Sequence, residues 1–265
     1  MSMHSHLHAE EAYLLPQLIL ALPFLLGLAV YLVCAAVSRR KYRCWPAWRI
    51  ACWITGVLFA VVSVAGPLAS SSHTDFTMHM YGHLFLGMLA PLLMVLAAPM
   101  TLVLRTVSVP AARRLTKILS SRPLCILTHP ITAALLNIGG LWLLYTTRLF
   151  TLMHEHILLY LLIHIHLFLA GYLFTASIIY IDPVAHRFSY LYRSVVLVFA
   201  LAGHGILSKH LYANPPDGVV QEQAEKGSMI MYYGGDIIDI VLIFILCLQW
   251  FRASRPKPVV QNANR

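Results

Sequence analysis

The sequence has few charged residues. Only 11% of its 265 residues are Asp, Glu, Lys or Arg, whereas soluble domains carry about 25%, and 59% are hydrophobic, with a mean hydropathy of +0.74. This scarcity of charge excludes a water-soluble globule. A helix needs about 20 apolar residues to cross a hydrocarbon core of about 30 Å. We therefore expect an all-α polytopic membrane helix bundle that forms a single membrane domain over residues 1–265.

Motifs of common enzyme chemistry are also missing. There is no P-loop pattern, no Gly-x-Ser-x-Gly elbow and no His-Glu-x-x-His motif, because His154-Glu155-His156 has a different spacing. The last apolar segment has no lysine for a retinal Schiff base. ATP-driven pumping, common hydrolysis and retinal binding therefore lack sequence support, and we expect a protein that is not an enzyme.

Seven apolar segments are long enough to cross a bilayer, and polar or proline-containing stretches separate them. No linker indicates a second domain. The predicted transmembrane helices span approximately residues 14–37, 48–68, 78–104, 126–145, 156–181, 195–211 and 230–250.

The basic residues predict the orientation of these seven spans. Nineteen Lys and Arg against ten Asp and Glu give a net charge of +9. Under the seven-span reading, sixteen of the nineteen fall on one side, and only Arg148, Lys209 and Lys226 fall on the other. Cytoplasmic loops carry an excess of Lys and Arg, so we expect the N-terminus outside and the C-terminus in the cytoplasm. The charge is explained by topology in a lipid bilayer, and no nucleic-acid partner is needed.

Cysteine is scarce, and no pair has the Cys-x-x-Cys spacing. All five residues map to the predicted cytoplasmic half, where thiols stay reduced. We expect no structural disulfide and interpret these side chains as small fillers of helix interfaces. They are Cys34, Cys44, Cys52, Cys125 and Cys247.

Histidines occur inside the predicted spans, where ionisable residues are costly and usually functional. His79 and His83 are four residues apart, so one helix face offers two imidazoles to one metal ion. His164 and His166 are two apart and point to nearly opposite sides of a helix. Only one of this pair should face the interior, while the other bonds a neighbouring helix. His204 lies roughly 10 Å below the outer end of its span.

Carboxylates and thioethers accompany these histidines. Asp236 and Asp239 lie about one turn apart on the seventh span. Imidazole binds copper, zinc and iron, thioethers select Cu(I), and carboxylates can orient a ligating imidazole. At about 1.5 Å per residue, the deeper groups come from four helices and share the outer half of the membrane. The candidate metal ligands are His79, His83, His154, His156, His164, His166, His204, Met78 and Met80, with Asp236, Asp239 and His210 as supporting polar groups.

Other interpretations use the same residues. The histidines and aspartates could pair with one another to hold the bundle together, or they could form a proton path. Haem is an alternative cofactor to copper, because bis-His ligation needs only two histidines on different helices. Met88 is interpreted as a packing residue, and Asn137 as a partner in an interhelical hydrogen bond.

The third predicted span and its neighbours carry a specific combination of motifs. The span contains His79-Met80-x-x-His83-Leu84-x-x-Gly87-Met88-Leu89-Ala90-Pro91 and continues to Ala98-Pro99-Met100. The accompanying motifs are His129-Pro130, Leu141-Trp142-Leu143-Leu144-Tyr145, His154-Glu155-His156, His164-x-His166-x-Phe168-Leu169-Ala170-Gly171 and Asp182-Pro183. From about the second span through the sixth, the sequence resembles the CtaG family of cytochrome c oxidase assembly factors.

The resemblance implies a bacterial plasma-membrane protein with seven spans that is needed for an active haem-copper oxidase. It also implies delivery of copper to the copper B centre of the oxidase catalytic subunit. The favoured hypothesis is a carrier that takes Cu(I) from an extracytoplasmic donor, holds it on His79, His83 and a fifth-span histidine, and passes it to that subunit. The alternatives are a membrane haem-binding protein, a structural scaffold for oxidase folding, and a proton-coupled ion transporter.

Overall fold

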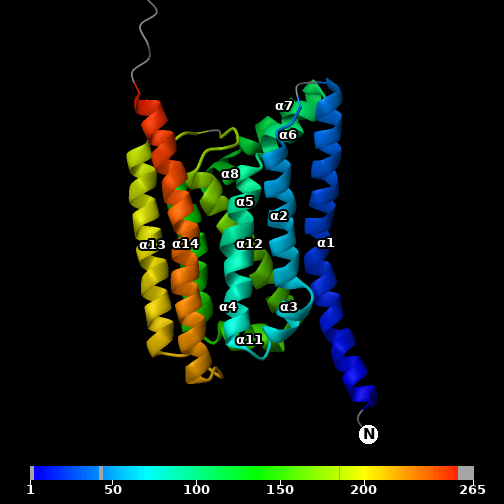
Figure 1. Ribbon diagram of the computed structural model, residues 1–265, viewed down its shortest axis with the longest axis vertical. Coiled ribbons are helices and arrows are strands. Elements are labelled where there is room, and N and C mark those ends of the chain that lie inside the picture. Colours follow the sequence, from blue (N-terminus) through cyan, green and yellow to red (C-terminus); the bar gives the residue numbers. More distant parts are fainter. Residues whose placement is uncertain (1–2, 42–43, 185, 256–265) are drawn as a thin grey trace, which may run out of the picture.

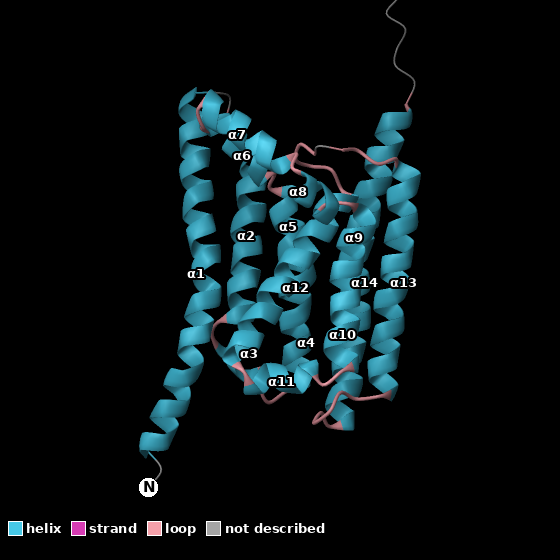
Figure 2. Ribbon diagram, turned by 180° about the vertical axis from the view of Figure 1, so that it is seen from behind, coloured by secondary structure: helices cyan, strands magenta, loops and turns pink. Residues whose placement is uncertain are grey.

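The protein is a bundle of long helices that run side by side (Figures 1 and 2). The computed structural model describes residues 3–41, 44–184 and 186–255, and within these ranges it contains helices and no strand. The all-α expectation is confirmed for this part of the chain. The elements are α1 (Met3–Lys41), α2 (Ala47–Val64), α3 (Pro67–Ser71), α4 (Phe76–Leu84), η1 (Phe85–Leu89), α5 (Ala90–Leu96), α6 (Pro99–Thr106), α7 (Val109–Leu119), α8 (Arg122–Leu127), α9 (Pro130–Ala134), η2 (Leu135–Gly139), α10 (Gly140–Thr146), α11 (Leu149–Glu155), α12 (Ile157–Ile178), α13 (Tyr190–Ala213) and α14 (Gln221–Ser254).

Six stretches of helix are long and apolar enough to cross a membrane, judged by length and composition. They are Leu14–Arg40, Ala47–Ser71, Phe76–Leu96, Ile157–Ile178, Tyr190–Ala213 and Gln221–Ser254. The remaining predicted span, 126–145, corresponds to a shorter apolar helix, Pro130–Thr146, built from α9, η2 and α10. This helix packs within the bundle, where α9 contacts both α12 and α13 (Figure 2).

The predicted third span, 78–104, is wrong at its C-terminal end. The helix stops at Leu96, and α6 begins as a separate helix at Pro99. Proline cannot donate a backbone hydrogen bond and disfavours the right-handed helical conformation of the residue before it. Ala98 accordingly adopts a left-handed conformation, with φ 52° and ψ 58°. The chain therefore changes direction here instead of continuing as one helix.

Side chains from other parts of the chain form hydrogen bonds with the backbone on both sides of this break. The Tyr31 hydroxyl donates to the Ala97 carbonyl at 2.9 Å, which satisfies an acceptor freed at the end of α5. The Asp182 carboxylate accepts from the backbone N–H groups of Met100 at 3.0 Å and Thr101 at 2.7 Å. Asp182 thus caps α6 and ties the segment after α12 to the same end of the bundle.

Basic residues gather at one end of the bundle. α1 and α14 both end there, and the basic helices α7 and α8 lie beside them (Figure 1). Arg39 and Arg40 close α1, and Arg252 lies in the last turn of α14. Many of the basic residues that the sequence assigned to one side therefore lie at one end of the bundle. Arg43, Lys257 and Arg265, which belong to the predicted basic side, lie outside the described residues.

Two π-helical turns, η1 and η2, interrupt the α-helices in the middle of the bundle. A Cβ atom at Gly171 of α12 would lie 1.9 Å from the Gly87 carbonyl oxygen of η1. Only glycine at position 171 permits this approach of the two backbones. The contact holds η1 against α12 and fixes the helix that carries His83.

Candidate functional site

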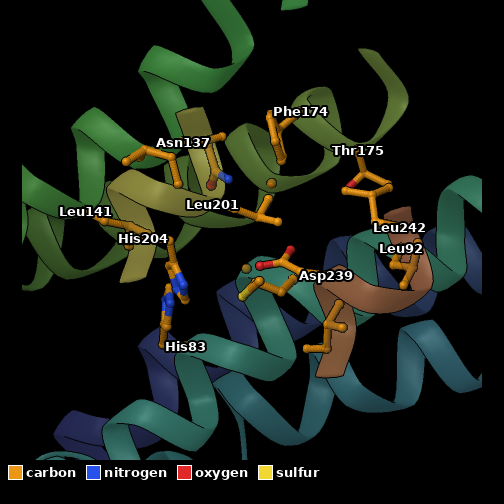
Figure 3. Close-up of a pocket in the computed structure, with 16 residues that line it drawn as sticks. His83, Leu92, Asn137, Leu141, Phe174, Thr175, Leu201, His204, Asp239 and Leu242 are labelled. Atoms are coloured by element: carbon orange, nitrogen blue, oxygen red, sulfur yellow. The ribbon is translucent and has the colours of Figure 1, made fainter. Parts of the chain in front are cut away.

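A small cavity lies in the interior of the bundle (Figure 3). Its volume is about 30 Å³, which exceeds the roughly 10–15 Å³ needed for one water molecule. Its polar lining comes from separate elements: His83 of α4, Asn137 of η2, Thr175 of α12, His204 of α13 and Asp239 of α14. The cavity therefore has room for a water molecule or a single ion.

The imidazoles of His83 and His204 face each other at this cavity (Figure 3). Their ring centroids are 6.1 Å apart with an interplanar angle of 26°, and the residues are only 2% and 4% exposed. Among the described residues, Nδ1 and Nε2 of His83 and Nε2 of His204 have no hydrogen-bond partner. An unpaired buried polar group costs about 1–3 kcal/mol. The histidine pair is therefore a place where a bound ion or water would restore lost interactions.

A glycine on α14 determines where the His204 ring lies. A Cβ atom at Gly235 would be 2.6 Å from Cε1 and 3.2 Å from Nδ1 of His204. The ring thus rests directly against the α14 backbone, in space that any other side chain would occupy. Because α14 packs on both α13 and α4, this contact sets the position of His204 relative to His83.

Asp239 and Met88 add two further kinds of donor to the cavity lining. Asp239 is 6% exposed, and its carboxylate lies at the cavity (Figure 3). Met88 follows His83 by five residues and lies within η1, whose π-type hydrogen bonds join residues five apart. The π-turn therefore brings the Met88 thioether to the same cavity as His83. Imidazole, thioether and carboxylate together form a donor set that suits a soft or borderline cation.

A continuous series of aromatic rings leads from one end of the bundle to this cavity. The ring centroids of His73 and His154 are 5.7 Å apart, and those of His154 and His79 are 6.4 Å apart. His79 Nε2 shares a hydrogen bond of 3.0 Å with the Tyr145 hydroxyl. The Tyr145 ring lies 6.3 Å from that of His83. We call His73, His154, His79, Tyr145 and His83 the ring series.

The outermost member of the ring series lies in the turn between α3 and α4, outside the candidate spans. Burial, together with the neighbouring His154, lowers the pKa of His73. Its imidazole therefore stays neutral, and so able to ligate a metal, at a lower pH than an exposed histidine.

The two fifth-span histidines point to different surroundings, as their spacing predicts. His164 is buried, and its Nδ1–H donates to the Tyr160 carbonyl at 2.9 Å, which leaves Nε2 as the acceptor nitrogen. His166 is exposed, and its Nε2–H donates to the Leu136 carbonyl on η2 at 3.1 Å. His164 lies near His79, His154 and His73. His83 is therefore paired with His204 and not with a histidine of α12.

Several other sequence-predicted residues lie away from the cavity. His156 is exposed at the N-cap of α12, and His210 is exposed and stacks on Trp142 with a centroid distance of 5.9 Å. Met80 is 0% exposed within an apolar cluster, whereas Met78 is half-buried. Asp236 is exposed on the outer face of α14. Within the described ranges, no three or more His, Cys, Asp or Glu side chains are grouped closely enough to hold a metal ion.

Sequence reasoning missed part of the lining. Tyr145 connects His79 to His83, yet the sequence motifs contain it only as the last residue of Leu141–Tyr145 and gave it no role at the site. Met88 and Asn137 also line the cavity, although the sequence interpretation gave them packing and interhelical roles. Both belong to π-turns, and such turns are frequent at functional sites.

The apolar helices and the buried histidine pair define a multi-pass helical membrane protein with an internal polar site. Residues 29–253 match the family described as cytochrome c oxidase caa3 assembly factor (Caa3_CtaG), and the chain belongs to this family. The resemblance noted from the sequence motifs is thereby confirmed.

Three curated mycobacterial proteins are similar to this chain. Proteins of Mycobacterium bovis and Mycobacterium tuberculosis, both described as uncharacterized, are 34% identical over 242 residues, covering 83% of this chain and 36% of each relative. An uncharacterized protein of Mycobacterium leprae is 29% identical over 235 residues, covering 81% of this chain and 36% of the relative. The chain thus spans about a third of the length of these relatives. No solved structure matches it.

Proposed function

We propose that this protein is an assembly factor of a haem-copper cytochrome c oxidase that carries a copper ion as cargo. The ion, as Cu(I), is held between His83 and His204 and passed to the catalytic subunit of the oxidase. The observation that carries this proposal is the set of unpartnered ring nitrogens of His83 and His204 beside a cavity with room for one ion. Family membership supplies the oxidase as the destination.

The chemistry of the donors supports Cu(I) as the cargo. Two neutral imidazoles and the Met88 thioether are ligand types that Cu(I) accepts, and Asp239 supplies a nearby negative charge. The histidines lie on different helices, and the described residues offer no closed set of three His, Cys, Asp or Glu ligands. Such a site binds with moderate affinity, which suits a carrier because release is part of its task.

The ring series supports a route of entry for this ion. An extracytoplasmic donor would deliver copper near His73 and His154, and His79 would follow on the way to His83. His164 lies beside this route and presents a free acceptor nitrogen. The copper ion would therefore exchange between neighbouring imidazoles at each step.

The proposed orientation places the entry of this route outside the cell. We propose a bacterial plasma-membrane protein with seven spans. The fourth span in chain order is the shorter helix Pro130–Thr146, which is about 26 Å long at 1.5 Å per residue. That length approaches the roughly 30 Å of a hydrocarbon core. The basic end of the bundle would face the cytoplasm, and the turn that holds His73 lies at the opposite end (Figure 1).

The size of the cavity favours an ion over haem. A volume of about 30 Å³ is far below the roughly 300 Å³ or more of pockets that hold larger ligands. Haem binding would require the helices to separate, whereas one ion requires only a small movement of two rings.

The test combines copper analysis with oxidase activity in strains that carry His83→Ala or His204→Ala. The matched control is His166→Ala, which removes an exposed histidine that bonds a backbone carbonyl away from the cavity. We expect about one Cu(I) per wild-type and control chain under reducing conditions, and at least about tenfold weaker binding in both cavity variants. We also expect oxidase activity to be lost in the cavity variants and restored by excess copper.

Other outcomes would favour the alternatives. Normal oxidase activity in His83→Ala and His204→Ala, with the protein present at its usual level, would overturn the carrier in favour of a structural scaffold. A Soret band that disappears in either variant would indicate haem. Proton-dependent ion flux in liposomes that is lost on replacing Asp239 would indicate a transporter.

A further inference from the structure

An acidic side chain faces outward from the middle of a membrane-spanning helix. Asp236 is exposed on α14 and lies about 22 Å from Gln221 and about 27 Å from Ser254, at 1.5 Å per residue. Its neighbours on the same helix face, Tyr233 and Ile240, are 61% and 62% exposed, and the next residue, Ile237, is 67% exposed. These apolar side chains mark the lipid-facing side of α14. Asp236 therefore projects toward lipid from within the apolar part of α14.

This placement is unfavourable for the protein alone. A carboxylate in the hydrocarbon region is costly unless another polar group pairs with it. The Asp236 carboxylate has no hydrogen-bond or ion-pair partner within the described part of the chain, where the nearby acidic group is Asp239 on the inner face of the same helix. A polar group of another membrane molecule would relieve this cost.

An apolar groove lies beside Tyr233, three residues before this exposed acid. The groove has a volume of about 540 Å³ and runs between α14 and the α4–η1 segment. Its walls are apolar and aromatic: Tyr81, Leu84, Phe85, Leu89, Met229, Ile230, Tyr233, Gly234, Ile237 and Ile238. Asp236 lies at the edge of the groove, because Tyr233, three residues earlier on the same helix face, is one of the groove residues. A helix that lies on Tyr233 would also reach Asp236.

The groove also borders the internal cavity. Ile238 lines both spaces, and so forms a wall between the histidine pair and the lipid-facing groove. Leu84 closes the same seam by packing over Gly234, where an added Cβ would lie 2.5 Å from its Cδ1. Ile238 therefore separates the cavity from the groove, and Leu84 lines the groove beside it.

We infer that this groove and Asp236 form a docking surface for a transmembrane helix of a different membrane protein. The docked helix presents a lysine, arginine, histidine or amide side chain that pairs with Asp236 within the membrane, and apolar side chains that fill the groove. A second copy of this chain is disfavoured, because a symmetric contact would bring two Asp236 carboxylates together. That the partner is the catalytic subunit of the oxidase rests on the proposed function. Docking at this seam would place that subunit beside the cavity that holds the copper ion.

Photocrosslinking in native membranes tests this surface. A photoreactive amino acid replaces Ile237 in cells that also produce the catalytic subunit of a haem-copper oxidase. The control replaces Phe199, which is 74% exposed on α13 and is not a groove residue. We expect a crosslink to the catalytic subunit from position 237 at a yield at least about tenfold above that from position 199. Adding Asp236→Leu should lower the yield at least about tenfold, because the polar pairing is lost. Asp236→Asn, which keeps hydrogen bonding, should lower it less.

Each contrary outcome has a distinct meaning. A crosslink between two copies of this chain would overturn the proposal in favour of self-association. Equal yields from positions 237 and 199, or a yield unaffected by Asp236→Leu, would overturn it as well. Copper bound to the purified wild-type and Asp236→Leu proteins is measured separately. A specific crosslink in a chain that binds no copper would refute the copper carrier but support the docking surface. Bound copper without a specific crosslink would support the copper carrier and refute the docking surface.

Discussion

Replacing Gly235 by alanine is expected to weaken copper binding without unfolding the bundle. The new Cβ would lie 2.6 Å from Cε1 of His204, whereas carbon atoms pack at about 3.5–4.0 Å. The ring must therefore retreat by about 1 Å. Metal–ligand distances tolerate only about 0.2 Å, so His204 would no longer share an ion with His83. We expect the dissociation constant for Cu(I) to rise about tenfold to a hundredfold.

The adjacent glycine provides the matched control. At Gly234 an added Cβ would meet only Cδ1 of Leu84 at 2.5 Å, the far end of a flexible side chain that can rotate away. Both substitutions exchange glycine for alanine within α14 and raise helix propensity by up to about 1 kcal/mol. Competition titrations with a Cu(I) chelator in detergent should therefore separate Gly235→Ala from Gly234→Ala, while thermal unfolding confirms that both variants fold. Equal copper affinities in the two variants would refute the assignment of His204 as a ligand.

Two further predictions concern the stability of the bundle. Gly171→Ala places a Cβ atom 1.9 Å from the Gly87 carbonyl oxygen and should lower the free energy of unfolding by at least about 1–3 kcal/mol. In the control Gly139→Ala the new Cβ meets no atom within 4 Å, so stability should be unchanged or increased. Thermal unfolding in detergent measures both, and similar Tm values would contradict the close contact of α12 with η1. Burial and the neighbouring His154 lower the pKa of His73. Below pH about 6.5 the unfolded chain therefore binds a proton at His73 that the folded chain does not, and the free energy of unfolding decreases as the pH falls. The loss of Tm between pH 7.5 and 5.5 should therefore be smaller in His73→Gln, and an unchanged loss would show that His73 does not titrate in this way.

Hydropathy and residue spacing were sufficient to predict much of the architecture. Long apolar runs predicted four of the six spans to within about five residues at both ends, because a bilayer-spanning helix needs an unbroken apolar stretch whatever it packs against. The predicted span 78–104 ran too far at its C-terminal end, and the predicted span 230–250 began too late. The spacing of His164 and His166 predicted that they face different surroundings, because helix geometry alone separates side chains two residues apart. Both inferences depend on local periodicity within one helix.

The pairing of His83 with His204 was beyond such reasoning. It depends on how α4, α13 and α14 are rotated relative to one another, and that rotation is fixed by contacts such as Gly235 against His204. Asp236 was placed with Asp239 for the same reason, although the rotation of α14 turns it outward. The end of α5 could have been predicted, because Pro99 disfavours a helical conformation at Ala98. The hydrophobic residues on both sides of Pro99 instead favoured one continuous helix.

The π-turn η1 makes the site sensitive to the number of residues as well as to their identity. A π-turn contains one residue more than the α-turn it replaces, and Phe85–Leu89 separates α4 from α5. Deleting any one of these residues would restore a regular α-helix and rotate α5 by about 100° relative to His83. Pro91 and Leu92 would then leave their buried positions against α12. Substitutions in this segment change one side chain, whereas a single-codon deletion would change the packing of every residue that follows in the helix.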